Sequence, residues 1–214
     1  MIIDKVYNTD NPLEWYLAYR TLYDQSSSSC LSNLIDVCLV LQGNKIYWQV
    51  SADGDNDAEA KLEDNRNTFV ATVLEAKGYF IKDQTRWSRS NTGKAPGEID
   101  IFIRDKNKRP LSIIEALNLD SLKEDYLKLH IDKLFKYDTT GLEHNFILVY
   151  VTAKKFDSFS TNYLNFIEKH IYKYSLMSVQ EENYEYTDIK VFKATHLRNG
   201  KEIVLYHILL NLYH

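Results

Sequence analysis

The chain is poor in the residues that break or cross-link a fold. Among its 214 residues are only two cysteines, three prolines and seven glycines. So little proline and glycine argues against long disordered tracts. The spacing of Cys30 and Cys38 fits burial in a helix and matches no zinc or redox motif. We therefore expect two reduced core cysteines in a protein of the cytosol.

Several motifs that mark large protein classes are also absent. The sequence has no P-loop or dinucleotide-binding glycine pattern, no Gly-x-Ser-x-Gly elbow, no HExxH motif and no zinc-type cysteine–histidine cluster. The first residues lack a basic segment followed by an apolar run. No apolar segment is long enough to span a bilayer. We expect a cytoplasmic protein with no membrane partner.

What is present is typical of a soluble α/β chain. Hydrophobic residues make up 44% of the sequence and charged residues 26%, which is enough to bury a core. The formal net charge is −4, so the whole molecule does not attract nucleic acid. Alternation of helical and strand patterns predicts a mixed sheet of about four to six strands with helices on both faces.

The pattern divides the chain into three parts. Residues 1–58 form an N-terminal accessory segment of helices and a short strand predicted at 45–50. Residues 59–153 form the central part, which begins with a helix over 59–77. Residues 154–214 add a helix over 154–174 and a C-terminal β-hairpin, which completes the same domain. The turn of that hairpin is Asn199-Gly200, a strong hairpin signal.

The central feature is a pair of acidic residues in neighbouring predicted strands. Residues 97–103 place Asp100 among isoleucines, and an apolar run over 111–115 ends on Glu115. The charged spacer between them has the length of a hairpin turn, so antiparallel pairing would bring the two carboxylates together. Buried carboxylates need a partner because their desolvation is costly. Two that converge favour a hard divalent cation such as Mg²⁺.

The order of helix, three strands, helix and strand over residues 60–153 resembles the PD-(D/E)XK (restriction-endonuclease-like) nuclease superfamily. Asp100 matches the Asp of its motif, and Glu115 matches the acidic member of the (D/E)XK triplet. The resemblance implies an αβββαβ core and Mg²⁺ or Mn²⁺ held by Asp100 and Glu115. Leu117 stands where the family has its lysine. Either catalysis is lost, or a lysine comes from elsewhere.

The helix predicted after Asp120-Ser121, running to about Tyr137, offers such a lysine. Lys133 follows His130 by three residues, on a side that borders the buried face. In the resembling superfamily, catalytic residues can move to a neighbouring helix and keep their place in space. Lys133 is thus our candidate for the ammonium, with Lys94 as a second. The resemblance also makes Glu63, on the first helix, a candidate third acidic residue. The alternatives are a snorkelling lysine and a surface carboxylate.

A basic window surrounds the carboxylate strand. Residues 82–109 carry eight basic and four acidic side chains in a chain of negative net charge. Our candidates for contact with nucleic-acid phosphates lie in this window, except His130, which follows it: Arg86, Arg89, Lys94, Lys106, Lys108 and His130. The alternative is a solvated loop face, which is what charge runs usually form.

These observations predict a metal-dependent nuclease that acts on DNA, with RNA as the less favoured substrate. The resemblance implies an effector domain of a bacterial anti-phage or restriction system. It also implies a sensor or ATPase module, on a partner or a longer parent chain, and leaves room for a homo-oligomer. The alternative, favoured by Leu117, is a catalytically inactive binding or scaffold module in a larger complex.

Overall fold

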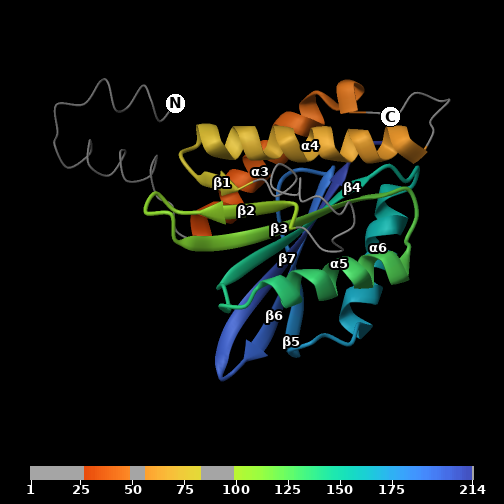
Figure 1. Cartoon of the computed structure of the whole chain (residues 1–214). Coiled ribbons are helices and arrows are strands. Elements are labelled where there is room, and N and C mark those ends of the chain that lie inside the picture. Colours follow the sequence, from red (N-terminus) through yellow and green to blue (C-terminus); the bar gives the residue numbers. More distant parts are fainter. Residues whose placement is uncertain (1–26, 49–55, 83–98, 214) are drawn as a thin grey trace.

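The chain is described by a computed structural model over residues 27–48, 56–82 and 99–213 (Figure 1). Four α-helices lie in this part of the chain: α3 (Ser27–Gly43), α4 (Asn56–Ala76), α5 (Glu124–Tyr137) and α6 (Phe156–Lys169). A short 3₁₀ helix, η1 (Lys45–Trp48), follows α3. The strands are β1 (Phe80–Lys82), β2 (Ile101–Arg104), β3 (Pro110–Leu119), β4 (His144–Val151), β5 (Ser175–Glu182), β6 (Ile189–Arg198) and β7 (Lys201–Asn211).

The described strands form one mixed sheet of seven in the order β1-β2-β3-β4-β7-β6-β5. The three central strands β3, β4 and β7 run parallel, and antiparallel strands flank them on both sides. The fold is therefore the expected mixed α/β class. The sheet is larger than the four to six strands we predicted, because β5 was not recognised and the final hairpin joins the sheet.

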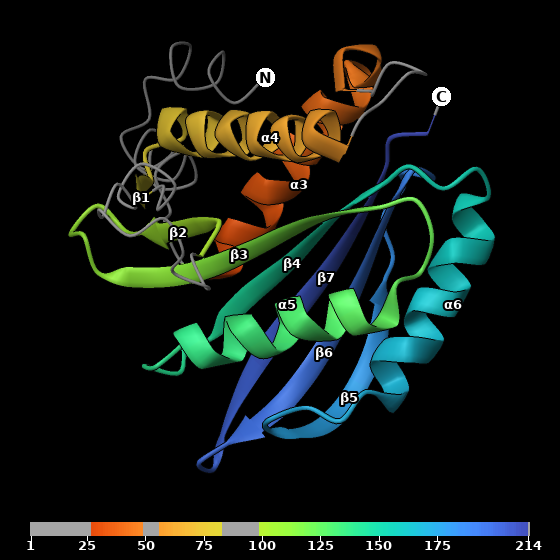
Figure 2. The ribbon, with the colours of Figure 1, turned by 45° about the vertical axis from the view of Figure 1, so that its right-hand side comes forward.

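Helices cover both faces of the sheet, as Figures 1 and 2 show from two directions. Helices α3 and α4 pack on one face, and α5 and α6 pack on the other. Strand β4 is apolar at nearly every position, because its side chains alternate between the two cores: Phe146, Leu148 and Tyr150 on one side, Ile147, Val149 and Val151 on the other.

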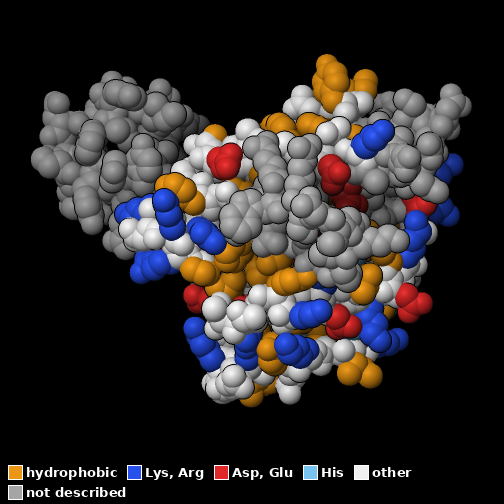
Figure 3. Space-filling model, in the orientation of Figure 1, with side chains coloured by type: hydrophobic (Ala, Val, Ile, Leu, Met, Phe, Trp, Pro, Cys, Tyr) orange, Lys and Arg blue, Asp and Glu red, His pale blue; other side chains and the backbone are white. Residues whose placement is uncertain are grey.

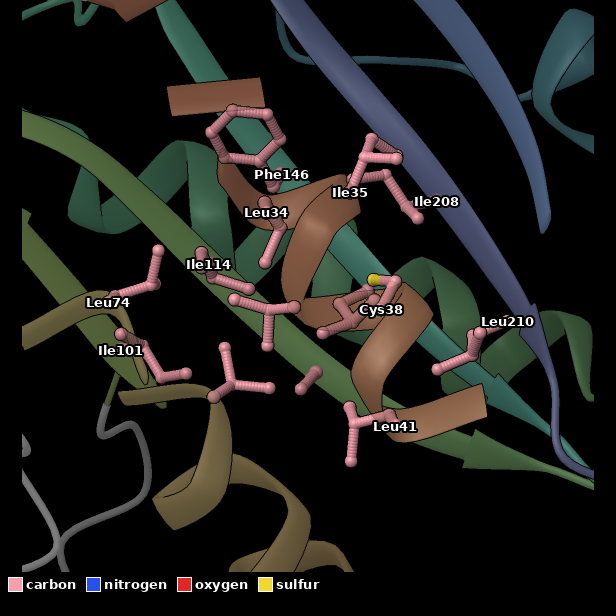
Figure 4. Close-up of a cluster of buried hydrophobic side chains, with 14 of the residues drawn as sticks. Leu34, Ile35, Cys38, Leu41, Leu74, Ile101, Ile114, Phe146, Ile208 and Leu210 are labelled. Carbon is pink, nitrogen blue, oxygen red and sulfur yellow. The ribbon is translucent and has the colours of Figure 1, made fainter. Parts of the chain in front are cut away.

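The core under α3 shows why this helix belongs to the domain (Figure 4). Leu34, Cys38 and Leu41 lie along one helical face and are fully buried against the sheet. They share a cluster with Ile114 of β3 and Ile208 of β7. Both cysteines are free and buried, as predicted. The part of the 1–58 segment that the structure describes is thus integral to the core.

Three predicted elements differ from the structure. Residues 45–48 form the 3₁₀ helix η1 and not the start of a strand. Helix α5 begins at Glu124, and Asp120 forms an ion pair with Lys123 instead of capping the helix from its first turn. Helix α6 ends at Lys169, and residues 175–182 form the edge strand β5.

The C-terminal hairpin has the predicted turn but an unexpected place. Asn199 and Gly200 both have positive φ, as a two-residue type I′ turn requires, and Arg198 pairs with Lys201. Strand β7 then inserts between β6 and β4, next to the centre of the sheet. Of the two places we expected for the hairpin, an extension of the sheet or a cover over one of its edges, the structure has the first, with β7 next to the central strand β4. Within the described residues, the helices are too short or too polar to cross a bilayer.

Candidate metal centre

The β2–β3 hairpin places Asp100 and Glu115 opposite one another. Ile101 pairs with Ile114 and Phe102 with Ile113, so the register continued by one residue puts Asp100 across from Glu115. Directly opposed residues of two antiparallel strands have Cβ atoms about 4.5–5.5 Å apart and face the same side of the sheet. That side is the α5 face, since Ile113 and Leu117 of β3 belong to the core under α5 and α6.

The edge of β3 explains how the carboxylates are fixed. Beyond the start of β2, no strand of the described residues pairs with β3 on that side, and two side chains accept from its backbone there. The N–H of Ala116 donates to Oδ2 of Asp100 at 2.7 Å. Two residues on, the N–H of Asn118 donates to Oε2 of Glu63, from α4, at 3.0 Å. Glu63 therefore reaches the same edge of β3 as Asp100.

Helix α5 brings two further groups to the pair. His130 and Lys133 are three residues apart, so they lie on one face of the helix, above Glu115. The Nζ atom of Lys133 is 2.7 Å from Oε2 of Glu115 and 3.7 Å from Oδ1 of Asp100. Nδ1 of His130 is 3.5 Å from Oε2 of Glu115. The structure thus brings Asp100, Glu115, His130 and Lys133 together, with Glu63 bordering them.

Burial sets the electrostatics of the group. The side chain of Glu115 is fully buried, and that of Asp100 is 20% exposed. Burial, and after it the charge of Glu115, raises the pKa of Asp100 to about 7, although the Lys133 ammonium and the Ala116 N–H oppose this. Burial likewise raises the pKa of Glu63, against the N–H of Asn118. Burial works against the charged form of Lys133, yet Asp100 and Glu115 together raise its pKa.

Tyr126 is a neighbour that the sequence pattern did not single out. Its side chain is partly exposed, and its ring lies edge-on to that of His130 at a centroid distance of 4.6 Å. Burial, and after it the charges of Glu63, Asp100 and Glu115, raises the pKa of Tyr126 to about 12. Tyr126, His130 and Lys133 are spaced i, i+4 and i+7 and therefore share one face of the helix, so this spacing could have identified Tyr126 as part of the site.

Arg66 of α4 supports the same edge from the other face. It is almost completely buried and donates to the side chain of Asn118 and to the carbonyl oxygen of Trp48. Its guanidinium also lies 5.2 Å from the ring centroid of Tyr150. These contacts hold Asn118, whose N–H binds Glu63, so Arg66 orders the β3 edge. Arg66 lies in a polar stretch of the sequence, so the sequence pattern did not indicate that its side chain is buried or that it has this role.

Asp100, Glu115 and His130 form the one cluster within the described residues that could hold a metal ion, with ligand atoms all within 4.8 Å of one another. Oε1 of Glu115 and Nδ1 of His130 are buried and have no hydrogen-bond partner among the described residues. Two carboxylates and an imidazole suit a divalent cation, because the oxygens accept Mg²⁺ or Mn²⁺ and the nitrogen favours transition metals. The residues present therefore fit a metal.

The predicted nucleic-acid contacts fall in three places. Arg86, Arg89 and Lys94 lie outside the described residues. His130 is buried beside Glu115. Lys106 and Lys108 are exposed in the β2–β3 turn, where Figure 3 shows lysine and arginine side chains gathered at one end of the molecule. That turn lies beyond Arg104, about 13 Å along β2 from Asp100.

Fold and site together define a mixed α/β protein that carries a buried pair of carboxylates, a histidine and a lysine on one face of its sheet. Comparisons with protein-family models, curated proteins and solved structures found no match to this chain. Its function is therefore argued from the site.

Proposed function

We propose that this protein is a metal-dependent nuclease that hydrolyses phosphodiester bonds in DNA. The observation that carries the proposal is the position of Lys133, whose ammonium lies beside both Asp100 and Glu115. A lysine from α5 thereby takes the place of the one that is missing at Leu117. Leu117 itself is fully buried in the core under α5 and α6.

The order of elements adds support. Helix α4, strands β1, β2 and β3, helix α5 and strand β4 follow one another along the chain. This is the order that a resemblance to the PD-(D/E)XK superfamily implies, with Asp100 just before β2 and Glu115 in the middle of β3. On the same resemblance, we propose that the protein serves as the nuclease of a bacterial defence system.

Each side chain has a distinct task in this mechanism. Asp100 and Glu115 would hold Mg²⁺ or Mn²⁺, with His130 as a third ligand. A divalent cation bound there would supply an activated water and neutralise charge on the scissile phosphate. The Lys133 ammonium would steady the attacking water and stabilise the negative charge that develops on the phosphorus oxygens. Lys106 and Lys108, at the far end of β2, would contact phosphates several nucleotides away from the cleaved bond.

A second function is favoured by the burial of the same groups. Asp100 and Glu63 accept hydrogen bonds from the N–H groups of Ala116 and Asn118, so both complete the edge of β3 whether or not metal is bound. A scaffold protein could keep them for that structural role alone. In that case Lys133 is the counter-ion that makes burial of Glu115 tolerable.

The deciding experiment is cleavage of plasmid and single-stranded DNA with Mg²⁺, Mn²⁺ or EDTA. Wild type is compared with Asp100→Asn, Glu115→Gln and Lys133→Ala. Lys136→Ala is the matched control, since Lys136 lies on the same helix and is exposed. We expect metal-dependent cleavage that falls about a hundredfold or more in the three site variants and is unchanged in the control.

Folded wild-type protein that cuts neither DNA substrate with any metal would contradict the proposal and favour the scaffold. Cleavage that survives in Asp100→Asn and Glu115→Gln would place the chemistry elsewhere. An RNA substrate of the same sequence, tested in parallel, separates a DNA nuclease from an RNA nuclease.

A further inference from the structure

The ammonium of Lys133 lies beside both of the carboxylates that would hold a metal ion. Its Nζ atom is within 3.7 Å of oxygens of both Asp100 and Glu115. The potential ligand atoms of Asp100, Glu115 and His130 are within 4.8 Å of one another. A metal ion held by Glu115 would therefore come within about 7 Å of the ammonium through either carboxylate oxygen, given ligand bonds of about 2.1 Å.

Two cations at that distance repel one another strongly. In water the repulsion would be weak, but Glu115 is fully buried and Lys133 is only 19% exposed, so the effective dielectric constant is far below that of water. The Asp100 and Glu115 carboxylates carry at most two negative charges. A divalent cation alone can balance those two charges, so the ammonium is then no longer needed to neutralise Asp100 and Glu115.

Two potential ligand atoms that Lys133 does not contact give a metal ion a place to begin binding while the lysine is in place. Oε1 of Glu115 and Nδ1 of His130 are buried without a hydrogen-bond partner in the described part of the chain. Lys133 itself is bound to the other oxygen of Glu115, Oε2. Entry of the metal at the free atoms then weakens the hold of the carboxylates on the lysine.

We infer that Lys133 is an internal counter-ion that competes with the divalent cation, and that metal binding releases its ammonium from the carboxylates toward the substrate phosphate. The inference rests on the metal site of the proposed function but not on cleavage. In the absence of metal, the lysine keeps the carboxylate pair stable. With metal bound, the same lysine becomes available to the nucleic acid. Lys133 thus lowers the affinity for metal but is needed for cleavage.

The test is the affinity for Mn²⁺ alone, measured by titration calorimetry at pH 8 without nucleic acid. Mn²⁺ is the probe because it accepts both carboxylate and imidazole ligands. We compare wild type with Lys133→Met, which keeps the aliphatic stem, and with Lys133→Arg, which keeps the charge. Lys136→Met removes the same charge from an exposed position on the same helix. We expect Lys133→Met to bind Mn²⁺ about tenfold more tightly or better, and the other two variants to stay within about threefold of wild type.

A second measurement uses wild type alone, so it does not depend on whether a variant folds. The rate at which an acylating reagent modifies the Lys133 amine is followed by mass spectrometry with and without Mn²⁺. We expect Mn²⁺ to increase the rate at Lys133 several-fold and to leave Lys136 unchanged.

The inference is overturned if Lys133→Met binds Mn²⁺ no more tightly than wild type, or if Lys136→Met gains as much. Protection of Lys133 by Mn²⁺, or no Mn²⁺ binding by any form, overturns it as well. Tighter Mn²⁺ binding by Lys133→Met together with a wild type that cleaves no nucleic acid supports the inference and contradicts the proposed nuclease. The two conclusions therefore fail separately.

Discussion

The environment of the Asp100 side chain favours its neutral, protonated form. Burial and the facing charge of Glu115 raise its pKa from 3.8 to about 7. Below about pH 4 the carboxyl is neutral in both the folded and the unfolded state, so it does not affect stability. As the pH rises toward 7, the unfolded chain ionises first and the folded state loses relative stability. Above that range the full cost of the charged pair is present.

Asp100→Asn should therefore stabilise the metal-free protein in a pH-dependent way. The amide oxygen still accepts from the N–H of Ala116, while the charge is gone. One unit of pKa corresponds to about 1.4 kcal/mol, and Glu115 shares the cost, so we expect a gain on the order of 2 kcal/mol at pH 8 and little near pH 4. Urea unfolding in EDTA at several pH values measures it. A variant that gains no more at pH 8 than at pH 4 would contradict the raised pKa.

That Asp100 and Glu115 come close together could be predicted from the sequence, because the 104–109 turn puts both on one face of the hairpin. Their direct pairing could not, since a symmetrical turn over 104–109 would pair Asp100 with Ile113 and the structure shifts register between Ile103 and Arg104. The helical spacing of His130 and Lys133 predicted that both lie on one side of the helix, bordering its buried face, and the structure puts that side over Glu115. Glu63 was harder, because its partner is the N–H of Asn118 and a sequence pattern does not reveal which backbone groups lack a strand neighbour. Whether these residues act in catalysis remains a prediction.

At the scale of the elements, a buried ion pair joins the end of α5 to the hairpin of β6 and β7. The carboxylate of Asp138 is fully buried and accepts from the backbone N–H groups of Gly141 and Leu142 and from the side chain of Asn145. Arg198 donates to the same carboxylate and to the carbonyl oxygen of Asp138. The pair thus fixes the connection between α5 and β4, and with it the position of the helix that carries His130 and Lys133.

Arg198→Met should destabilise the protein by about 3 kcal/mol, since removing one partner of a buried pair leaves the other charge uncompensated. Lys190→Met is the matched control. It breaks the exposed pair with Glu181, in which both side chains are more than 30% exposed, so its cost should stay below about 1 kcal/mol. Urea unfolding at pH 7.5 compares the two. Equal losses in both variants would show that burial of Asp138 does not set the cost.

The elements that the sequence predicted well are those with a long periodic pattern. Helix α4 and strand β4 lie where the apolar spacing placed them, since each buries a continuous stripe or run. Strand β5 was missed because residues 175–182 mix polar and apolar side chains on an exposed edge of the sheet. The central place of β7 was also missed. Apolar side chains on both faces indicate a buried strand, but not which two strands are its neighbours.

For the molecule as a whole, two buried histidines link stability to pH. His196 and His207 lie on the sheet face covered by α5 and α6. Burial, followed by the charge of His170, lowers the pKa of His196 to about 4, although a hydrogen bond with the backbone of Tyr174 opposes this. Burial, followed by the charges of His196 and His170, lowers the pKa of His207 to about 3. Both rings are therefore neutral in the folded protein throughout the physiological range.

The pH dependence of stability that comes from His196 and His207 is opposite in sign to that from Asp100. Below its ordinary pKa of 6.5, each histidine gains a proton in the unfolded chain but not in the folded one, so stability falls as the pH decreases. Each histidine should therefore lower the free energy of unfolding by about 2 kcal/mol at pH 5 relative to pH 8. His196→Gln and His207→Gln remove the titration, and the amide of the second can still bond to the hydroxyl of Tyr163. We expect each variant to lose less stability than wild type between pH 8 and pH 5.

The effect of Asp100 on stability can be separated from that of His196 and His207, because a rise in pH lowers stability through Asp100 and raises it through the histidines. Asp100→Asn should raise stability most at pH 8, and the histidine variants should reduce the loss at pH 5. The triple variant should then have a flatter profile than wild type between these values, because three groups whose pKa values differ between the folded and unfolded states no longer titrate. Unfolding free energies from urea titrations at pH 5, 6.5 and 8 test this. A wild type that becomes more stable from pH 6.5 to pH 5 would show that the raised pKa of Asp100 outweighs the two histidines, and the pH limit set by these groups would then lie on the alkaline side, in the metal centre.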